Sequence, residues 1–267
     1  MTVRTLGPAG TYSHRAARTL DDDVSFEPSV SAIVAAVDRG ETDRGVVPIE
    51  NSIEGSVTET LDALVDADVA VVGERVLPIR HALLAQTGSF ETVASHAQAL
   101  AQCRDFLSNA YPNATREAVS STAAAVDLAR RDADVAAIAH PSAAGDGVGV
   151  LASDVQDRSS NRTRFFVLAP DAERSTSGEK STLVIAPETN HPGLLYQLLE
   201  PFAEREVNLS RIESRPTGNE LGEYVFHLDI EAGLDEPRTR EALDAVEDVA
   251  GEAAVIRLGA YDVTDVE

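Results

Sequence analysis

The sequence predicts an α/β protein whose C-terminal part is a separate ferredoxin-like unit. Short apolar runs typical of strands alternate with longer amphipathic stretches typical of helices, and the short connections between them favour parallel or mixed sheets. A polar segment at residues 171–180 separates two apolar strands and has the composition of a linker. The pattern after this linker has the order β-α-β-β-α-β, which defines a ferredoxin-like split unit.

Before the linker, the spacing of the apolar residues predicts each element in turn. Apolar residues that recur every three or four positions indicate helices, and short apolar runs indicate strands. The expected elements are a helix through Ile33, Val34 and Val37 that ends before Gly40, a strand at 46–47 that ends at Pro48, a helix through Leu61, Leu64 and Val65, strands at 69–72 and 92–95, helices at 97–109 and 121–131, and a strand at 135–139.

After the linker, the same reasoning predicts six further elements. They are a strand at 181–186, a helix at 193–205, strands at 208–215 and 224–230 separated by a turn that contains glycine, a helix at 238–249 and a strand at 254–258. The pairing of these strands is inferred from the ferredoxin-like motif.

The chain is strongly acidic. Its 267 residues carry 22 Lys+Arg against 45 Asp+Glu, which gives a formal net charge of −23, and Lys180 is the only lysine. This charge argues against nucleic acid and anionic membrane surfaces as partners, because both attract Lys and Arg. Scarce lysine with dense carboxylates is typical of a surface adapted to concentrated salt, although an ordinary acidic protein is the alternative.

Cysteine content and hydropathy indicate the compartment. Cys103 is the only cysteine, so an intramolecular disulfide and a CxxC motif are excluded. The N-terminal residues lack the features of a signal peptide, and no apolar run approaches the roughly 20 residues that span a bilayer. We therefore expect a soluble, cytoplasmic protein.

Two polar motifs lie at the ends of expected strands, where α/β proteins bind ligands. In residues 7–13, two glycines allow close approach of the backbone to a ligand, and Thr11 or Ser13 can cap the following helix and favour a bound anion. In residues 45–56, Glu50 and Asn51 follow an apolar strand. An ordinary strand-to-helix turn explains the first motif equally well, and a turn plus an N-cap explains the second.

Helix capping explains two further motifs without a ligand. Ser95 is expected to cap the helix at 97–109, in which Gln98 and Gln102 share one face, and the neighbouring His96 is interpreted as structural. The hydroxyls of Ser121 and Thr122 suit the start of the helix at 121–131.

A fifth motif brings two arginines to the start of an apolar strand. Arg162 and Arg164 flank Thr163, and Phe165 begins the apolar run. Because arginine binds carboxylates in a bidentate manner, this segment is a candidate anion-binding point with a hydroxyl donor beside it.

Read together and in this order, the motifs resemble those of prephenate dehydratases that carry a C-terminal ACT regulatory domain. The resemblance spans essentially the whole chain, and the composition resembles that of haloarchaeal proteins. The matching segments are Thr-Arg-Phe at 163–165, Pro-Ile-Glu-Asn at 48–51, Ser-His-x-Gln at 95–98, Pro-Gly-Leu-Leu at 192–195 and Glu-Ser-Arg-Pro at 213–216.

The resemblance implies a fold and domain boundaries. Residues 1–173 would form a catalytic domain like a periplasmic binding protein, and residues 180–267 an ACT domain. The catalytic domain would consist of two subdomains that close around a cleft, one formed by about 1–75 plus 161–173 and the other by 76–160.

The resemblance also implies a reaction. A lyase of this family converts prephenate to phenylpyruvate with loss of CO2 and water, and because aromatisation drives the reaction, no cofactor or metal is expected. Thr163 would donate a hydrogen bond to the departing hydroxyl as the catalytic residue, and Arg164 would hold a substrate carboxylate. The substrate-binding residues implied by the resemblance are Thr11, Glu50, Asn51, Ser95, Gln102, Ser121, Thr122, Arg164 and Phe165.

Regulation and assembly follow from the ACT resemblance. It implies feedback inhibition by L-phenylalanine at an interface between ACT units, and therefore a homo-oligomer, a dimer or a tetramer, formed through the ACT and catalytic domains. The implied effector-binding residues are Gly193, Leu194, Leu195, Glu213, Ser214, Arg215 and Pro216. Arogenate dehydratase and a non-catalytic amino-acid-binding regulator are the alternative functions.

Overall fold

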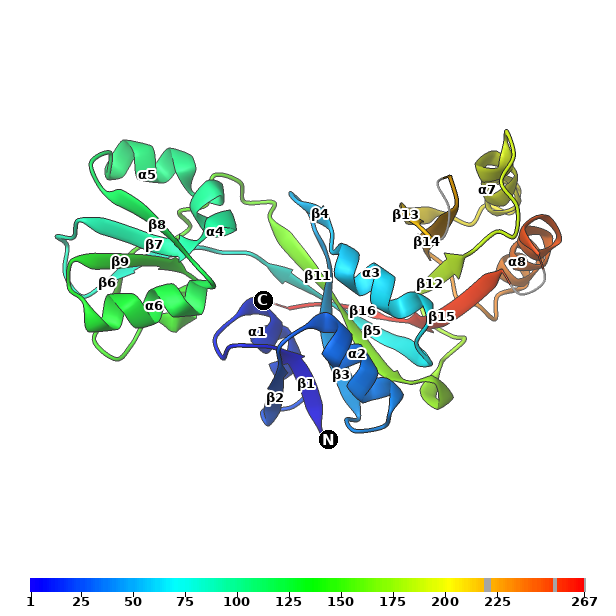
Figure 1. The fold of residues 1–267 in the computed structure, drawn as a ribbon, viewed down its shortest axis with the longest axis horizontal. Coiled ribbons are helices and arrows are strands. Elements are labelled where there is room, and N and C mark those ends of the chain that lie inside the picture. The colour runs from blue at the N-terminus through cyan, green and yellow to red at the C-terminus, as the bar shows by residue number, and fades with distance from the viewer. Residues whose placement is uncertain (219–221, 252–253, 267) are drawn as a thin grey trace. The chain divides into compact units, whose positions relative to one another are not determined.

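The computed structural model describes residues 1–218, 222–251 and 254–266 and divides into two compact units (Figure 1). The first unit comprises Met1–Leu6, Ala16–Val76 and Arg164–Val266, and the second comprises Gly7–Arg15 and Leu77–Thr163. Each unit contains its own mixed sheet, as the predicted α/β class requires.

The first unit is built on a sheet of seven strands in the order β16-β5-β11-β3-β1-β2, with β4 paired to β3. Strands β1, β2 and β3 are parallel, whereas β3 and β4 form a hairpin. The strands are β1 (Val3–Leu6), β2 (Val24–Glu27), β3 (Arg44–Asn51), β4 (Gly55–Ser56), β5 (Val69–Pro78), β11 (Arg162–Pro170) and β16 (Val263–Asp265).

Helices α2 (Val30–Asp38) and α3 (Thr58–Val65) pack on this sheet through the apolar stripes that the sequence predicts. Helix α2 begins where the Ser29 hydroxyl accepts a hydrogen bond from the backbone N–H of Ala32. The predicted end of a strand at Pro48 is wrong, because β3 continues to Asn51. Its register with β1 ends at Val46, so the missing N–H of Pro48 breaks no bond to that neighbour.

The second unit is built on a five-stranded sheet in the order β10-β6-β9-β7-β8. The alternation of β9 decides its two faces: Ala136 and Ile138 pack under α4 and α5, whereas Ala137 and Ala139 pack under α6. The elements are β6 (Ala82–Ala85), β7 (Thr92–His96), α4 (Ala97–Gln102), α5 (Arg104–Ala110), β8 (Thr115–Val119), α6 (Thr122–Arg131), β9 (Val135–Ala139) and β10 (Gly149–Ala152), with α1 (Tyr12–Arg18) beginning in this unit and ending in the first.

The single helix predicted at 97–109 is wrong, because the chain breaks it at Cys103 into α4 and α5. The backbone carbonyl of Gln102 accepts a hydrogen bond from the N–H of Asp157 at 2.7 Å. The buried Cys103 has φ −115° and ψ 20°, outside the helical range, and packs with Leu100 and Leu107 in the core.

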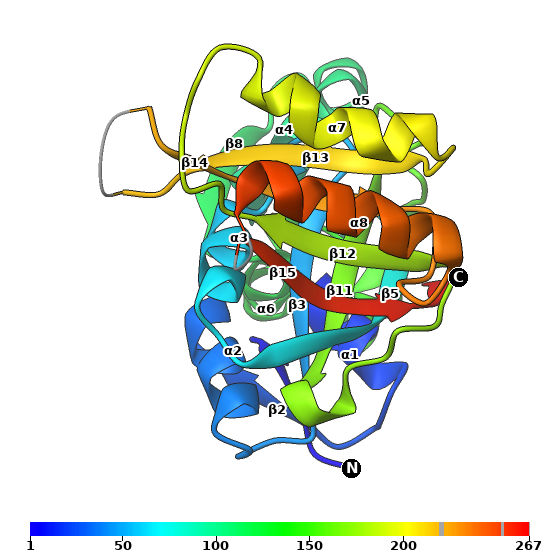
Figure 2. The same cartoon turned by 90° about the vertical axis from the view of Figure 1, so that its right-hand side faces the viewer.

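The C-terminal segment forms the predicted β-α-β-β-α-β unit, an antiparallel sheet in the order β13-β14-β12-β15. Figure 2 shows both of its helices on one face of this sheet. The other face contributes Val184, Val225 and Tyr261 to the core that contains Phe166 and Leu168 of β11. The elements are β12 (Lys180–Ile185), α7 (Leu194–Glu204), β13 (Leu209–Pro216), β14 (Tyr224–Ile230), α8 (Pro237–Ala250) and β15 (Val255–Tyr261).

Two details complete the comparison with the predicted elements. The predicted turn between β13 and β14 includes residues 219–221, which lie outside the described residues. Strands β2, β4, β6, β8, β10 and β16 were not predicted from the sequence, and β16 pairs in parallel with β5. In the described parts of the chain, no helix has both the length and the apolar character needed to span a membrane.

Candidate active site

The residues implied in substrate binding are distributed over both units. Thr11, Ser95, Gln102, Ser121, Thr122 and Thr163 lie in the second unit, and Glu50, Asn51, Arg164 and Phe165 lie in the first. The boundary between the units falls between Thr163 and Arg164, which are consecutive residues of β11.

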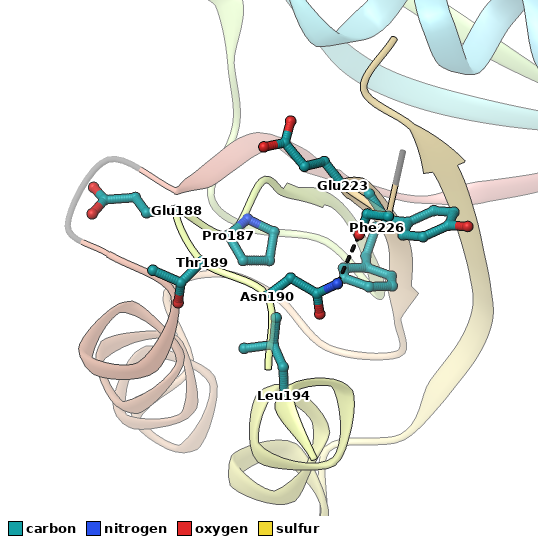
Figure 3. A pocket seen from close by; sticks show the side chains of 9 residues that line it. Pro187, Glu188, Thr189, Asn190, Leu194, Glu223 and Phe226 are labelled. Carbon is teal, nitrogen blue, oxygen red and sulfur yellow. Dashed lines mark hydrogen bonds between the residues drawn. The ribbon is translucent and has the colours of Figure 1, made fainter. Parts of the chain in front are cut away.

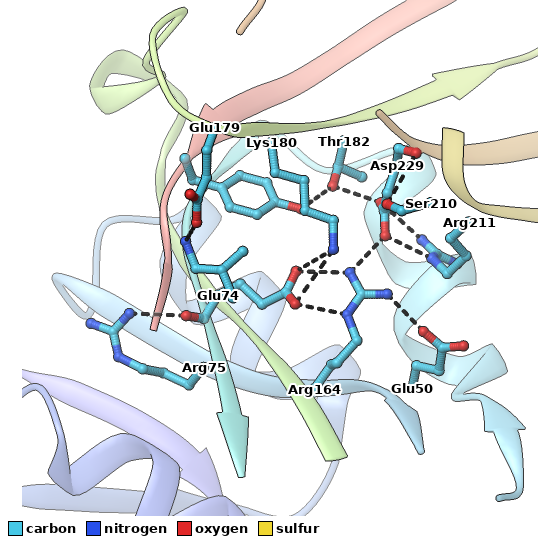
Figure 4. A network of polar contacts seen from close by, with 12 residues as sticks. Glu50, Glu74, Arg75, Arg164, Glu179, Lys180, Thr182, Ser210, Arg211 and Asp229 are labelled. Carbon is cyan, nitrogen blue, oxygen red and sulfur yellow. Dashed lines mark hydrogen bonds and ion pairs between the residues drawn. The ribbon is translucent and has the colours of Figure 1, made fainter. Parts of the chain in front are cut away.

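Arg164 is the centre of a buried ion network in the first unit (Figure 4). Its side chain is 15% exposed, and each of its three nitrogens donates to a carboxylate. Nη1 lies 2.6 Å from Glu50 Oε2, Nε lies 2.8 Å from Glu74 Oε1, and Nη2 lies 2.7 Å from both Glu74 Oε2 and Asp229 Oδ2. The guanidinium therefore joins β11 to β3, β5 and β14.

The ACT-like sheet contributes three more members to this network. The ammonium of Lys180 lies 3.1 Å from Glu74 Oε2, and Arg211 Nε lies 2.9 Å from Asp229 Oδ2. The Thr182 hydroxyl donates to Asp229 Oδ1 at 2.9 Å. The side chains of Glu74 and Asp229 are 2% and 0% exposed, so their charges are compensated within the protein and not by water.

The network sets the protonation of its members. Burial alone would raise the pKa of the Asp229 carboxyl, but the positive charges of Arg211 and Arg164 outweigh it and lower this pKa to about 2. Burial alone would lower the pKa of Arg164, but its hydrogen bonds to Glu74 and the charge of Asp229 raise it above the ordinary value. Both groups are charged at neutral pH.

Glu74 and Asp229 were missed by the sequence reasoning, although each has a visible signal. Asp229 lies between Leu228 and Ile230 in β14, and Glu74 lies in a strand whose only other charged residue is Arg75. Lys180, which pairs with Glu74, is the only lysine of the chain.

The other implied residues of the first unit have structural contacts of their own. The carboxamide oxygen of Asn51 accepts from the backbone N–H groups of Ile53 and Glu54 at 3.0 and 3.2 Å, which closes the β3–β4 hairpin. The turn interpretation is thus confirmed, but the N-cap interpretation is wrong because the next helix begins at Thr58. Phe165 is buried. Substrate contact by either residue stays a prediction.

Two of the predicted caps in the second unit are confirmed. The Thr11 hydroxyl accepts from the backbone N–H of His14 at 3.2 Å, and the Ser121 hydroxyl accepts from that of Ala124 at 3.0 Å. Gly10, just before the first cap, has φ +86°, a conformation that favours glycine.

The predicted cap at Ser95 is wrong. Strand β7 runs one residue further than expected, so the buried Ser95 hydroxyl donates to the carbonyl of Ile138 at 2.6 Å. The residue that caps α4 is His96, whose Nδ1 accepts from the N–H of Gln98. This agrees with the structural interpretation of His96, and the substrate contact of Ser95 stays a prediction.

Gln102 is oriented by a buried histidine that the sequence reasoning did not single out. His81 Nε2 lies 2.9 Å from Gln102 Oε1, and burial lowers the pKa of this histidine. An amide oxygen only accepts, so the neutral His81 ring carries its proton on Nε2. The ring of Tyr12 stands edge-on to His81 and His140, with centroids 6.2 and 5.8 Å away.

The ACT-like segment contains a small pocket beside the start of α7 (Figure 3). Its lining includes Asn190, whose amide donates to the carbonyl of Gly222 at 2.7 Å. Leu194 is the one implied effector residue that lines it, and Gly193, with φ +89°, begins the helix. The lining residues are Pro187, Glu188, Thr189, Asn190, Leu194, Gly222, Glu223, Tyr224 and Phe226.

The Glu-Ser-Arg-Pro segment lies elsewhere, on β13. Glu213 accepts a hydrogen bond from the Ser56 hydroxyl at 3.0 Å, and the guanidinium of Arg215 forms an ion pair with Asp62 of α3 at 2.8 Å. Within the first unit these side chains join the ACT-like sheet to the β3–β4 hairpin and α3.

The fold and these sites define an α/β enzyme scaffold with a C-terminal ACT domain. The family model for prephenate dehydratase matches residues 3–173, and that for the ACT domain matches residues 188–248. The chain belongs to the prephenate dehydratase family and is therefore a lyase.

Similar proteins agree with this assignment. The prephenate dehydratases of Lactococcus lactis subsp. lactis and Bacillus subtilis are each 35% identical to the chain, and each alignment covers 98% of both proteins. The solved structure of prephenate dehydratase from Arthrobacter aurescens in complex with L-Phe has a TM-score of 0.87 and 37% identity, and covers 98% of this chain and 90% of that one.

Proposed function

We propose that the chain converts prephenate to phenylpyruvate, with loss of CO2 and water, in L-phenylalanine biosynthesis. The observation that carries the proposal is the similarity to prephenate dehydratases over nearly the whole chain, with Thr163-Arg164-Phe165 intact in β11. The domain boundaries that we propose are 1–173 for catalysis and 180–267 for the ACT domain.

The proposed chemistry needs a placed proton donor. Prephenate carries two carboxylates and a ring hydroxyl, and the hydroxyl leaves as CO2 is lost. We assign Thr163 as the donor that stabilises developing charge on the departing oxygen. The N–H groups at the start of α6, next to Ser121, favour a substrate carboxylate. The other substrate contacts that we propose are Thr11, Glu50, Asn51, Ser95, Gln102, Thr122 and Phe165.

The same assay separates this function from its alternatives. Phenylpyruvate formation from prephenate is measured in concentrated salt, beside turnover of arogenate, which carries an amino group in place of the side-chain keto group. A higher kcat/KM for prephenate is expected. A preference for arogenate would make the protein an arogenate dehydratase, and binding of L-phenylalanine without turnover of either substrate would make it a regulator.

Feedback inhibition by L-phenylalanine is the second part of the proposal. The ACT pocket beside α7 supports it, together with the L-Phe complex of the Arthrobacter aurescens protein. An effector can inhibit only by binding the less active state more tightly.

We also propose that the protein is a homo-oligomer. The exposed apolar side chains Leu195 and Tyr196 of α7 and Ile212 of the edge strand β13 support assembly through the ACT domain.

The net charge of −23 leads to a prediction about salt. We propose a halophilic, cytoplasmic enzyme, in which screening lets a dianionic substrate approach an acidic surface. We expect kcat/KM to rise several-fold between about 0.1 M and about 1 M KCl, as the Debye length falls from about 10 to about 3 Å. Steady-state kinetics across a salt series measures this, with circular dichroism to separate unfolding from repulsion. Full activity in dilute buffer would contradict the proposed adaptation.

For regulation, we expect Arg215→Ala to weaken phenylalanine inhibition, raising the inhibition constant about 10-fold, a typical allosteric coupling. Basal kcat should change far less. The matched control is Asp62→Asn, which breaks the same ion pair but keeps the Arg215 charge. Inhibition unchanged by Arg215→Ala would remove this residue from the effector site, and equal effects of both variants would assign the effect to the ion pair.

A further inference from the structure

The buried network around Arg164 joins the strand that carries Thr163 to the ACT sheet. Glu50, Glu74 and Arg164 come from the seven-stranded sheet of the first unit, whereas Lys180, Arg211 and Asp229 come from β12, β13 and β14 of the ACT sheet (Figure 4). These six side chains carry three positive and three negative charges, so the network is neutral as a whole.

Protein carboxylates occupy four of the five N–H donors of the Arg164 guanidinium. Its three nitrogens make four hydrogen bonds of 2.6–2.8 Å to Glu50, Glu74 and Asp229. A substrate carboxylate at Nη1 would lie beside three protein carboxylates, and one at Nε or Nη2 would displace the buried Glu74 or Asp229 and leave its charge uncompensated. This arrangement favours a role in holding protein groups over a role in holding substrate.

We infer that Arg164 is a positioning residue: its bonds to Glu74 and Asp229 fix β11 and thereby the adjacent Thr163, and they couple this strand to the ACT domain. The inference rests on the proposed function, since it assigns how Thr163 is oriented and regulated. It moves Arg164 from the substrate-binding residues to the support of the catalytic hydroxyl.

Lys180 shows that the network is distinct from the acidic surface. Of the 22 basic residues it is the only lysine, yet its side chain is 12% exposed and paired with Glu74. An ion pair at this depth is screened by salt much less than a surface pair. The network therefore keeps its geometry in the concentrated salt that the surface composition indicates.

Strand β14 gives the route from the ACT pocket to Arg164. Tyr224 and Phe226 at its start line the pocket, and Asp229 near its end contacts Arg164. A shift of β14 caused by a ligand in the pocket would move Asp229, and Arg164 would transmit it to Thr163. The predicted coupling between the pocket and Thr163 depends on these contacts, so mutation of Asp229 should remove it.

The test is Asp229→Asn, which keeps the shape of the side chain but removes its charge. We expect kcat for prephenate to fall about 10- to 100-fold, since small misplacements of catalytic groups have effects of this size. KM should stay within about threefold, because substrate binding is not changed directly. The residual activity at saturating L-phenylalanine should be a larger fraction of the uninhibited rate than in the wild type.

The matched control is Asp62→Asn, which breaks another ion pair made by the ACT sheet, the one between Arg215 of β13 and Asp62 of α3. It should leave kcat within about twofold, as expected for an exposed pair. If Asp229→Asn does not fold, Thr182→Val removes the hydroxyl that donates to Asp229 and that also bonds to the Tyr261 hydroxyl, and a smaller fall in kcat at constant KM is expected. Circular dichroism reports folding in each case.

The outcomes separate this inference from the proposed function. A wild-type protein without prephenate turnover would overturn the proposed function, and the positioning role with it. An active wild type whose Asp229→Asn or Thr182→Val variant keeps its kcat, or changes only in KM, would overturn the positioning role alone. If kcat falls equally in Asp62→Asn and Asp229→Asn, the effect comes from a general loosening of the ACT sheet. That outcome would also overturn the positioning role.

Discussion

Thr163→Val is expected to lower kcat by roughly 100- to 1000-fold, the effect of removing one placed donor from a developing oxyanion. Valine matches threonine in shape, so the half-buried position on β11 should keep its packing while losing the hydroxyl. KM for prephenate should stay within about threefold, because the lost interaction is made mainly in the transition state. Steady-state kinetics in concentrated salt measures both constants.

Thr163→Ser is the matched control, since serine restores the hydroxyl without the methyl group. It should recover most of the lost kcat. Near-normal activity of Thr163→Val would refute the proposed role of this residue, and a rise in KM without loss of kcat would make Thr163 a binding residue.

Thr163 and Arg164 have different proposed roles although they belong to one short motif. The two residues are consecutive on β11, and alternation along a strand turns their side chains to opposite faces. The Arg164 side chain enters the network that joins β11 to the ACT sheet. The hydroxyl that we assign to the reaction is thus one peptide unit away from the residue that we assign to hold it.

The sequence predicted the elements whose burial is local in origin. Ile33, Val34 and Val37 form one face of α2, and the hydroxyls of Thr11 and Ser121 cap their helices, since both features depend only on neighbours along the chain. The α/β class and the order of the ACT-like elements followed from the same local patterns.

The features that the sequence reasoning missed depend on residues distant along the chain. The helix break at Cys103 accompanies a hydrogen bond from the N–H of Asp157 to the carbonyl of Gln102. The Ser95 hydroxyl donates to the carbonyl of Ile138 on β9, and β16 is a strand only because β5 pairs with it. Similarly, Arg164 was predicted as an anion site because its chemistry suits carboxylates. The carboxylates it contacts here belong to the protein.

His227 is a buried histidine on β14 whose removal should change how the protein responds to acid. It is inaccessible to solvent, and neither ring nitrogen has a hydrogen-bond partner among the described residues. Burial, helped by the positive charge of Arg211, lowers its pKa to about 4. The ring is therefore neutral in the folded protein at any pH above this value.

The direction of the pH effect follows from the difference between the pKa of His227 in the folded protein and in the unfolded chain. As the pH falls below 6.5, the ordinary value, the unfolded chain binds a proton that the folded protein refuses until about pH 4. Stability is therefore lost between these two values, by about 3 kcal/mol in total, and above pH 6.5 the group makes no contribution to the pH dependence. Asp229 acts in a different window, since its lowered pKa costs stability only below its ordinary value of 3.8.

We expect His227→Leu to lose about 3 kcal/mol less stability between pH 7 and pH 4 than the wild type. At pH 7 the variant should be at least as stable, because it replaces two unpaired buried nitrogens by an apolar group of similar size. Urea unfolding at constant salt over this pH range measures both quantities. Part of the acid dependence should remain, since burial also lowers the pKa of His81 and of His140 in the second unit. The control is His191→Leu, which removes an exposed imidazole and should behave like the wild type. An acid dependence that is unchanged in His227→Leu would refute the neutral buried state of His227.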